Sequence, residues 1–445
     1  MPKTIPACPE KPAKRRPAEE SRPFAVELVT PMFGGGVQVR VNDATHPIRE
    51  TAVRGQLEFW WRATRGYRFT TVPDLRAEQT RIWGNTETPS KVRVVVDRVA
   101  ADDPAPAGEI RWDAQARQGR GGWRLNWHDP FQERDSALPY ALFPFQGKVP
   151  PSNPNARVEE PPASCIRRAS FRLTVSCEPQ FWVEVEAALW AWVNFGGMGG
   201  RTRRGCGAVY CKDFAPPTAP QVEAWLKERF AAYGLTTAAG PAAWPQLAAA
   251  VLVRPQGGSA VETWNWVVGR FREFRQGKNL ARDPGGARPG RSRYPEPNTI
   301  RDATGVWDHP PQGTVPLRAF PRAELGLPIV FHFQGQGVPP DTILSPVVGG
   351  TRRERMASPL ILKPLQTADG TAVPLIMRLR APQVDEVELT GPHPKLPVRS
   401  SVIRDPGLAT YKGPDSPLTG LSANGSAVEG FLAFATNVAN GFQRV

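Results

Sequence analysis

The chain has 445 residues, 40% of them hydrophobic, which is enough for two or three domains with well-formed cores. Its formal net charge of +14 favours a nucleic acid or another anionic surface over a neutral small substrate. No run of about 18 apolar residues is present, and the basic N-terminus lacks the apolar core of a signal peptide, so we expect a cytoplasmic protein.

The first half of the chain predicts alternating strands and helices. Alternating apolar residues indicate strands, and apolar residues at helical spacing indicate helices. Strands are predicted at 24–29, 91–100, 169–177 and 207–214, and helices at 51–65 and 181–195. The resulting order is β-α-β, a long insertion, and β-α-β. This is the split βαβ or ferredoxin-like order, which RNA-recognition modules also use.

The second half is less regular and predicts another α+β domain. Helices are expected at 220–233, 242–252 and 261–275, and strands at 327–333, 358–365 and 373–381. The 49 prolines and 41 glycines cluster at 101–122, 146–163 and 276–316, where we expect extended loops. The predicted organisation is a disordered basic tail at 1–22, a first domain at 23–215 and a second domain at 216–445.

The five cysteines are scattered and odd in number. They are Cys8, Cys165, Cys177, Cys206 and Cys211. No CxxC pair is present and no histidine completes a zinc set, so we expect reduced thiols, no metal and no cofactor.

A glycine- and arginine-rich loop, FGGMGGRTRRGCG, runs from Phe195 to Gly207. It follows a predicted helix and precedes a predicted strand, which is the reverse of the order in a nucleotide-binding glycine loop. The glycines allow the backbone to approach a ligand, and Arg201, Arg203 and Arg204 provide planar donors for a run of phosphates. RNA is therefore the expected partner. The alternative interpretation is that the glycines only turn the chain and the arginines are solvated.

The predicted helix at 51–65 adds cationic and aromatic side chains. Arg54, Trp61 and Arg62 fall on one face, because offsets of seven and eight residues return to the same side of a helix. They could contact RNA beside the glycine-rich loop. The alternative is that the tryptophans are core residues and that the arginines form i,i+4 ion pairs with Glu58.

Four segments together resemble the RAMP superfamily of CRISPR proteins, over roughly residues 24–380. They are TPMFGGG from Thr30, IRETAVRGQLEFWWRATRG from Ile48, the loop from Phe195, and RSRYPEPNTIRD from Arg291. Within that superfamily the chain looks like the first RAMP subunit of the type III-B Cmr effector complex. It departs from compact members through Pro/Gly/Arg-rich insertions at 101–165 and 276–316.

The resemblance implies two ferredoxin-like domains in tandem around an RNA-binding cleft. It implies a non-catalytic subunit that holds the 3′ region of the guide RNA, its duplex with target RNA, or both, beside other RAMP subunits. The expected RNA-binding residues are Arg49, Arg54, Trp61, Arg62, Gly196, Gly197, Gly199, Gly200, Arg201, Arg203, Arg204, Arg293 and Arg301. Arginine side chains and backbone amides bind phosphate without reading sequence.

Two other functions stay open. Some RAMP relatives cleave CRISPR RNA without a metal, and His46, just ahead of the arginine-bearing helix, is the one histidine placed for acid–base chemistry. A two-metal nuclease is weakly supported, because Asp97 and Asp213 have no second acidic residue near them in sequence. The chain could also be an interaction subunit whose basic surface contacts proteins.

Overall fold

The computed structural model describes most of the chain. The described ranges are 19–116, 121–132, 136–151, 153–235, 242–277, 280–283, 291–307, 317–410 and 416–445. Within these ranges no helix is both long and apolar enough to cross a membrane. The first strand begins at Glu20, so residues 20–22 belong to a sheet and not to the predicted tail.

The first sheet has four antiparallel strands in the order β3-β8-β1-β9. The strands are β1 (Glu20–Leu28), β3 (Val92–Ala101), β8 (Ala169–Cys177) and β9 (Val209–Tyr210). Helices α1 (Glu50–Arg65) and α5 (Trp182–Phe195) connect them, which gives the predicted order β1-α1-β3-β8-α5-β9. Strand β9 is shorter than predicted because a 3₁₀ turn, η5 (Lys212–Phe214), follows it.

The second sheet repeats this arrangement. Its strands are β10 (Gln246–Val253), β14 (Leu360–Gln366), β15 (Ala372–Arg380) and β18 (Gln443–Arg444), in the order β14-β15-β10-β18. Helices α7 (Ala260–Gln276) and α10 (Ala427–Thr436) complete the order β10-α7-β14-β15-α10-β18. The helix predicted at 242–252 is wrong. Its alanine content favours a helix, but pairing of β10 with both β15 and β18 overrides that weak preference.

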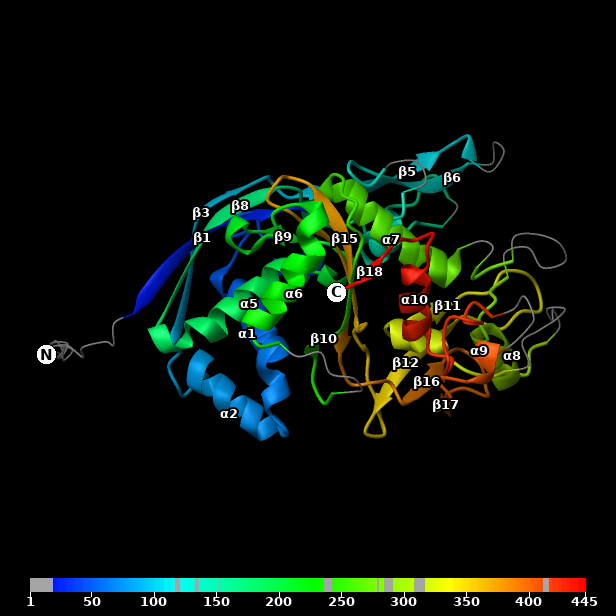
Figure 1. Ribbon diagram of the computed structural model, residues 1–445. Helices are drawn as coiled ribbons and strands as arrows, with labels where there is room; N and C mark the ends of the chain where they lie inside the picture. Colours follow the sequence, from blue (N-terminus) through cyan, green and yellow to red (C-terminus); the bar gives the residue numbers. More distant parts are fainter. Residues whose placement is uncertain are drawn as a thin grey trace, which may run out of the picture.

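Sheets and helices alternate in layers (Figure 1). Helices α1 and α5 lie between the two sheets, where Trp60 and Trp192 share one apolar core with Val373 and Leu375 of β15. Helices α7 and α10 cover the other face of the second sheet and bury Ile376 in a second core. Both faces of β15 are thus buried, as its continuous apolar run indicates.

Another helix belongs to this first core. Helix α6 (Val222–Ala232) packs on α5, with the rings of Trp190 and Phe230 5.5 Å apart. The predicted domain boundary after residue 215 therefore precedes a helix that packs on the first unit.

Two excursions of the second unit build a third sheet. Its strands are β11 (Ile329–Phe331), β12 (Thr342–Val348), β13 (Thr351–Arg352), β16 (Glu386–Thr390) and β17 (Val398–Ser400), in the order β11-β12-β16-β17 with β13 beside β12. Helices α8 (Glu296–Thr304) and α9 (Gly407–Thr410) accompany it. This sheet has its own small core, which includes Leu344, Val387 and Leu389.

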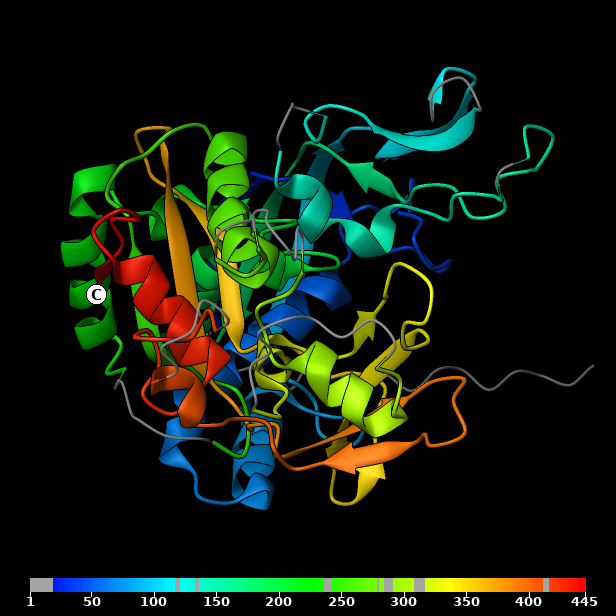
Figure 2. The same cartoon turned by 90° about the vertical axis from the view of Figure 1, so that its right-hand side faces the viewer.

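The insertion at 101–165 is more ordered than predicted. Its elements are β4 (Ala105–Pro106), β5 (Gly108–Asp113), β6 (Gly122–Trp127), α4 (Leu138–Ala141), η2 (Phe143–Phe145) and, at its end, β7 (Ser164–Ile166). Strands β5 and β6 form a hairpin that projects from the body (Figure 2), with Trp112 opposite Trp123. Strand β2 (Met32–Phe33) pairs with β7, and α2 (Val72–Trp83) follows α1.

Candidate nucleic-acid interface

The glycine-rich loop is folded tightly against the first unit. The Gly200 N–H donates to the carbonyl of Phe33 at 2.7 Å, and the Met198 N–H donates to the carbonyl of Gly207 at 2.8 Å. A Cβ on Gly196 would lie 2.5 Å from Nε1 of Trp60, and one on Gly197 would lie 2.6 Å from the carbonyl oxygen of Gly207. These glycines are therefore required by packing.

The tip of this loop is its most accessible part. Gly199 is exposed and has a φ of +76°, which a residue with a side chain would adopt only with strain. Gly200 is half-buried. The backbone at these two positions could meet a ligand, whereas Gly196 and Gly197 are buried.

A buried lysine supports the start of the loop. Nζ of Lys363, on β14, donates to the carbonyls of Val193 at 2.8 Å and Gly196 at 3.1 Å, at the C-terminal end of α5. An ammonium is favourable there because the last helical carbonyls have no intrahelical partners. Burial lowers the pKa of Lys363 to about 7. Lys363 is not among the residues predicted from the sequence.

Arg204 is a structural residue, which corrects its prediction as a phosphate contact. The residue is 8% exposed, and its guanidinium donates to the carbonyls of Arg203, Leu360 and Leu325 at 3.0, 2.9 and 3.2 Å. Burial lowers the pKa of Arg204 to about 9. These bonds tie the glycine-rich loop to the second unit, where Trp264 Nε1 also donates to the Arg204 carbonyl at 2.6 Å.

Arg201 and Arg275, both half-buried, form an arginine cluster between the two units, with the buried Arg204 beside them. Arg201 has a φ of +57°, and its Nε is buried without a hydrogen-bond partner in the described part of the chain. Arg275, on the last turn of α7, donates to the hydroxyl of Tyr140 at 2.7 Å. Arg203 donates to the carbonyl of Ser358.

This arginine cluster has little negative charge to balance it. Burial lowers the pKa of Arg201 and of Arg203, and the charge of Arg275 lowers that of Arg201 further. Besides Arg275, the titratable groups that act on the pKa of Arg201 are the Cys206 thiol and the Tyr140 phenol, so no carboxylate among the described residues contributes. Half-buried like charges of this kind favour a bound anion.

The insertion at 101–165 forms one wall of this site. Phe145 stacks on Phe33 with ring centroids 4.4 Å apart, and a Cβ on Gly200 would lie 3.3 Å from the Phe145 ring. On the other side, the Asn265 side chain of α7 accepts from the Ala137 N–H at 2.7 Å. The insertion thus bridges both units beside the arginine cluster. Neither Tyr140 nor Arg275 carries a sequence signal that would have identified it.

The arginine-bearing helix α1 has a structural role, as the alternative interpretation proposed. Trp61 is wholly buried, and its indole N–H donates to Glu184 at 3.1 Å. It is therefore a core residue, which corrects its prediction as an RNA contact. Arg54 pairs with Glu58 at 3.1 Å and donates to backbone carbonyls of α2 and β3. Arg62 donates to Gln79 at 3.0 Å, and burial lowers its pKa.

The N-terminal end of α1 is more open. Arg49, the N-cap residue, is exposed. His46 is also exposed, and its backbone N–H donates to Asp43 at 2.9 Å. Bonds from this N–H and from that of Thr45 lower the pKa of Asp43.

The motif around residue 291 is also structural. Arg301 is 7% exposed and lies over the ring of Phe333, which corrects its prediction as a phosphate contact. Arg293 is paired with Asp283 at 2.9 Å. Tyr294 is buried and donates to the carbonyl of Phe274 at 2.9 Å. The motif fastens this segment to α7.

The remaining chemical candidates are engaged elsewhere. Asp97 forms two bonds of 2.6 Å with Arg172, and these lower its pKa. Asp213 accepts from the thiol of Cys211. The four cysteines of the described ranges are free and buried, and Cys8 lies outside those ranges, as does His309. No described group of three or more His, Cys, Asp or Glu side chains could hold a metal ion.

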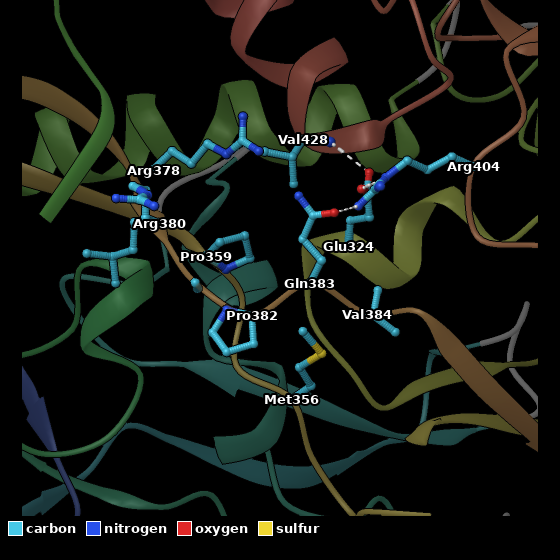
Figure 3. Close-up of a pocket in the computed structure, with 12 residues that line it drawn as sticks. Glu324, Met356, Pro359, Arg378, Arg380, Pro382, Gln383, Val384, Arg404 and Val428 are labelled. Carbon is cyan, nitrogen blue, oxygen red and sulfur yellow. Dashed lines mark hydrogen bonds and ion pairs between the residues drawn. The ribbon is translucent and has the colours of Figure 1, made fainter. Parts of the chain in front are cut away.

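A pocket beside α10 differs from the arginine cluster in its charge balance (Figure 3). Arg404 pairs with Glu324 and donates to Gln383 at 2.7 Å. Glu324 in turn accepts from the N–H of Ala427 at the start of α10, and Arg378 pairs with Glu429. Carboxylates thus balance the charge of Arg404 and Arg378. The pocket lies where the second unit meets the third sheet.

A family model matches most of the first unit. Residues 25–210 match the family model described as the RAMP superfamily. This match confirms the predicted resemblance over that segment, which contains α1 and the glycine-rich loop.

Two solved structures match at low identity and with TM-scores below 0.5. Cmr1 from Pyrococcus furiosus is 15% identical with a TM-score of 0.43, over 86% of this chain and 94% of that chain. A chain of the type III-B Cmr-beta complex bound to cognate target RNA is 11% identical with a TM-score of 0.42, over 80% of this chain and 94% of that chain. No curated protein matches the sequence.

Proposed function

We propose that the chain is a non-catalytic RNA-binding subunit of a type III-B CRISPR (Cmr) ribonucleoprotein. It would hold the 3′ region of the guide RNA, its duplex with target RNA, or both. The RAMP-superfamily match over residues 25–210 supports this function. So does the combination of segments from Thr30, Ile48, Phe195 and Arg291.

The architecture supports a tandem RAMP fold. We interpret each four-stranded sheet with its two connecting helices as one ferredoxin-like unit, because both units have the same chain order and the same strand order. The partners would be guide RNA, target RNA and other RAMP subunits, in the cytoplasm and without a cofactor.

The arginine cluster is the observation that carries the proposal. Arg201 and Arg275 converge from two units without a balancing carboxylate in the described structure. A phosphate among them would accept charge-assisted hydrogen bonds and offset the mutual repulsion of the guanidinium groups. Such contacts do not depend on base sequence, so the subunit could hold any guide.

The alternative, RNA cleavage with His46, has weaker support. Metal-free cleavage needs an acid and a base that both change protonation state during the reaction. The carboxylate beside His46 is that of Asp43, which accepts from the backbone N–H groups of Thr45 and His46, and no hydrogen bond among the described residues joins it to the His46 ring. We therefore retain the non-catalytic role.

The test compares RNA affinity in rising salt. The variant is Arg201→Ala/Arg275→Ala, and the control is Arg81→Ala/Arg229→Ala. The control loses the same charge and two cation–π contacts, because Arg81 lies over Phe181 and Arg229 over Trp225. We expect the variant to lose at least tenfold in affinity and the control to bind like wild type. Equal affinity of variant and wild type would refute this site.

A further inference from the structure

Helix α7 presents aromatic and cationic side chains on two opposite flanks. Trp264, Phe271 and Arg275 are spaced by seven and four residues, so they share the flank that meets the glycine-rich loop. Trp266 and Arg270, four residues apart, lie on the other flank. The first flank belongs to the site described above, whereas the second flank has no assigned role.

The second flank repeats the stacking arrangement of the first. On the first flank, Phe271 lies under Arg204 and Arg275, with guanidinium carbons 4.6 and 5.6 Å from its ring centroid. On the second flank, the guanidinium carbons of Arg254 and Arg270 lie 4.6 and 5.5 Å from the centroid of the Trp266 ring. Each flank of α7 thus holds two guanidinium groups against one aromatic ring.

The loop beside Trp266 is the counterpart of the glycine-rich loop. It joins α10 to β18, just as the glycine-rich loop joins α5 to β9 in the first unit (Figure 1). Its Asn440 is buried, donates to the carbonyl of Phe434 at 2.7 Å and accepts from Arg270 at 3.4 Å. Val438, at its tip, is fully exposed. The loop is therefore held in place while its tip is open to solvent.

Arg254 is the uncompensated cation of this second flank. Its guanidinium has no hydrogen-bond acceptor or carboxylate partner among the described residues, whereas Arg270 is paired with Glu273 at 2.9 Å. Gly441 lies beside it, since a Cβ there would be in ordinary van der Waals contact with Arg254 Nε, at 3.6 Å. Stacking on the indole leaves the in-plane N–H donors of a guanidinium free to bind an anion.

We propose that Arg254, Arg270 and Trp266 form a second phosphate-binding site, which contacts the backbone of a single-stranded segment of RNA. Both guanidinium groups lie against Trp266 beside an exposed loop tip, and the charge of Arg254 has no carboxylate partner among the described residues. The identity of the polyanion as RNA rests on the proposed function. The site itself lies on a different flank of α7, so RNA held at both sites would pass around this helix.

The experiment measures binding of a labelled single-stranded RNA of about 40 nucleotides, longer than one site of roughly 4–16 nucleotides. The full chain is compared with Arg254→Ala/Arg270→Ala, with Arg201→Ala/Arg275→Ala, and with the control Arg81→Ala/Arg229→Ala. Each protein is titrated at several salt concentrations, and circular dichroism checks its fold. Arg254→Lys/Arg270→Lys tests whether charge alone is sufficient.

We expect Arg254→Ala/Arg270→Ala to weaken binding about five- to tenfold. We also expect it to reduce the slope of log affinity against log salt by about 1.4, the value for two lost phosphate contacts on a single strand. Wild-type affinity and slope in this variant would overturn the second site, even if the Arg201/Arg275 variant is impaired. Wild-type affinity and slope in the Arg201/Arg275 variant, together with weaker binding by the Arg254/Arg270 variant, would overturn the first site and support the second.

Discussion

Arg201 in the glycine-rich loop and Arg275 at the end of α7 come from different units of the fold, yet lie so close that the charge of Arg275 adds to the effect of burial, which lowers the pKa of Arg201. Two like charges at a buried junction destabilise each other unless an anion lies between them. This relationship connects the fold to the proposed function, because only the packing of both units brings the two side chains together.

A polyanion should therefore stabilise the protein. With RNA at about 100 times its Kd, the free energy of unfolding should increase by about 2.7 kcal/mol. We expect thermal melting with added RNA to show a higher Tm for wild type and a much smaller rise for Arg201→Ala/Arg275→Ala. A rise of the same size in both proteins would place the RNA elsewhere.

Arg204→Ala should destabilise the fold more than it affects RNA contacts directly. It removes a buried guanidinium that satisfies three carbonyls, and leaving buried carbonyls without donors costs about 1–3 kcal/mol. Urea unfolding should show a loss in that range, whereas the half-buried Arg229→Ala control should change by less than about 0.5 kcal/mol. An unchanged midpoint for Arg204→Ala would contradict its role as a tie between the units.

Lys363 should make stability depend on pH. Its pKa is about 7 in the folded protein and near 10.5 when the chain is unfolded, so between these values the unfolded state binds more protons. The free energy of unfolding should consequently rise with pH across that window, by at most about 1.4 kcal/mol per pH unit.

The control for this effect is Lys363→Met, which has no titratable group. Chemical denaturation at pH 7, 8, 9 and 10 should give a flatter profile for this variant than for wild type. Parallel profiles for the two proteins would show that Lys363 keeps an ordinary pKa.

Trp61→Phe distinguishes a core residue from an RNA contact. The substitution keeps an aromatic ring but removes the indole N–H that donates to Glu184, so we expect a stability loss of about 1–2 kcal/mol. RNA affinity of the folded protein should equal that of wild type. A large loss of affinity with unchanged stability would restore Trp61 as an RNA contact.

The sequence predicted most of the first unit because its signals are local. Alternating apolar residues marked β1, β3 and β8, and helical spacing marked α1 and α5. The same signals misled for β10, where alanines favour a helix but two neighbouring strands provide the hydrogen bonds. Local propensity could not reveal a pairing with β15, more than a hundred residues away.

The candidate site was predictable only in part. Glycine and arginine content marked the loop at 195–207, but which arginines are buried depends on the second unit, which covers Arg204 and leaves Arg201 half open. Tyr140 and Arg275 join the site through long-range packing, and neither has a distinctive sequence environment. The resemblance located the glycine-rich loop and helix α1, whereas only the tertiary structure distinguished arginines that could contact RNA from buried arginines that stabilise the fold.

The most direct test of RNA binding at the arginine cluster is ultraviolet cross-linking of the full chain to 4-thiouridine-labelled RNA, followed by mass spectrometry of the cross-linked peptides. Our account predicts cross-links in the peptides that contain the glycine-rich loop at 195–207, the segment around Tyr140 and the end of α7. Cross-links confined to other surfaces, such as the β5–β6 hairpin or the third sheet, would contradict it.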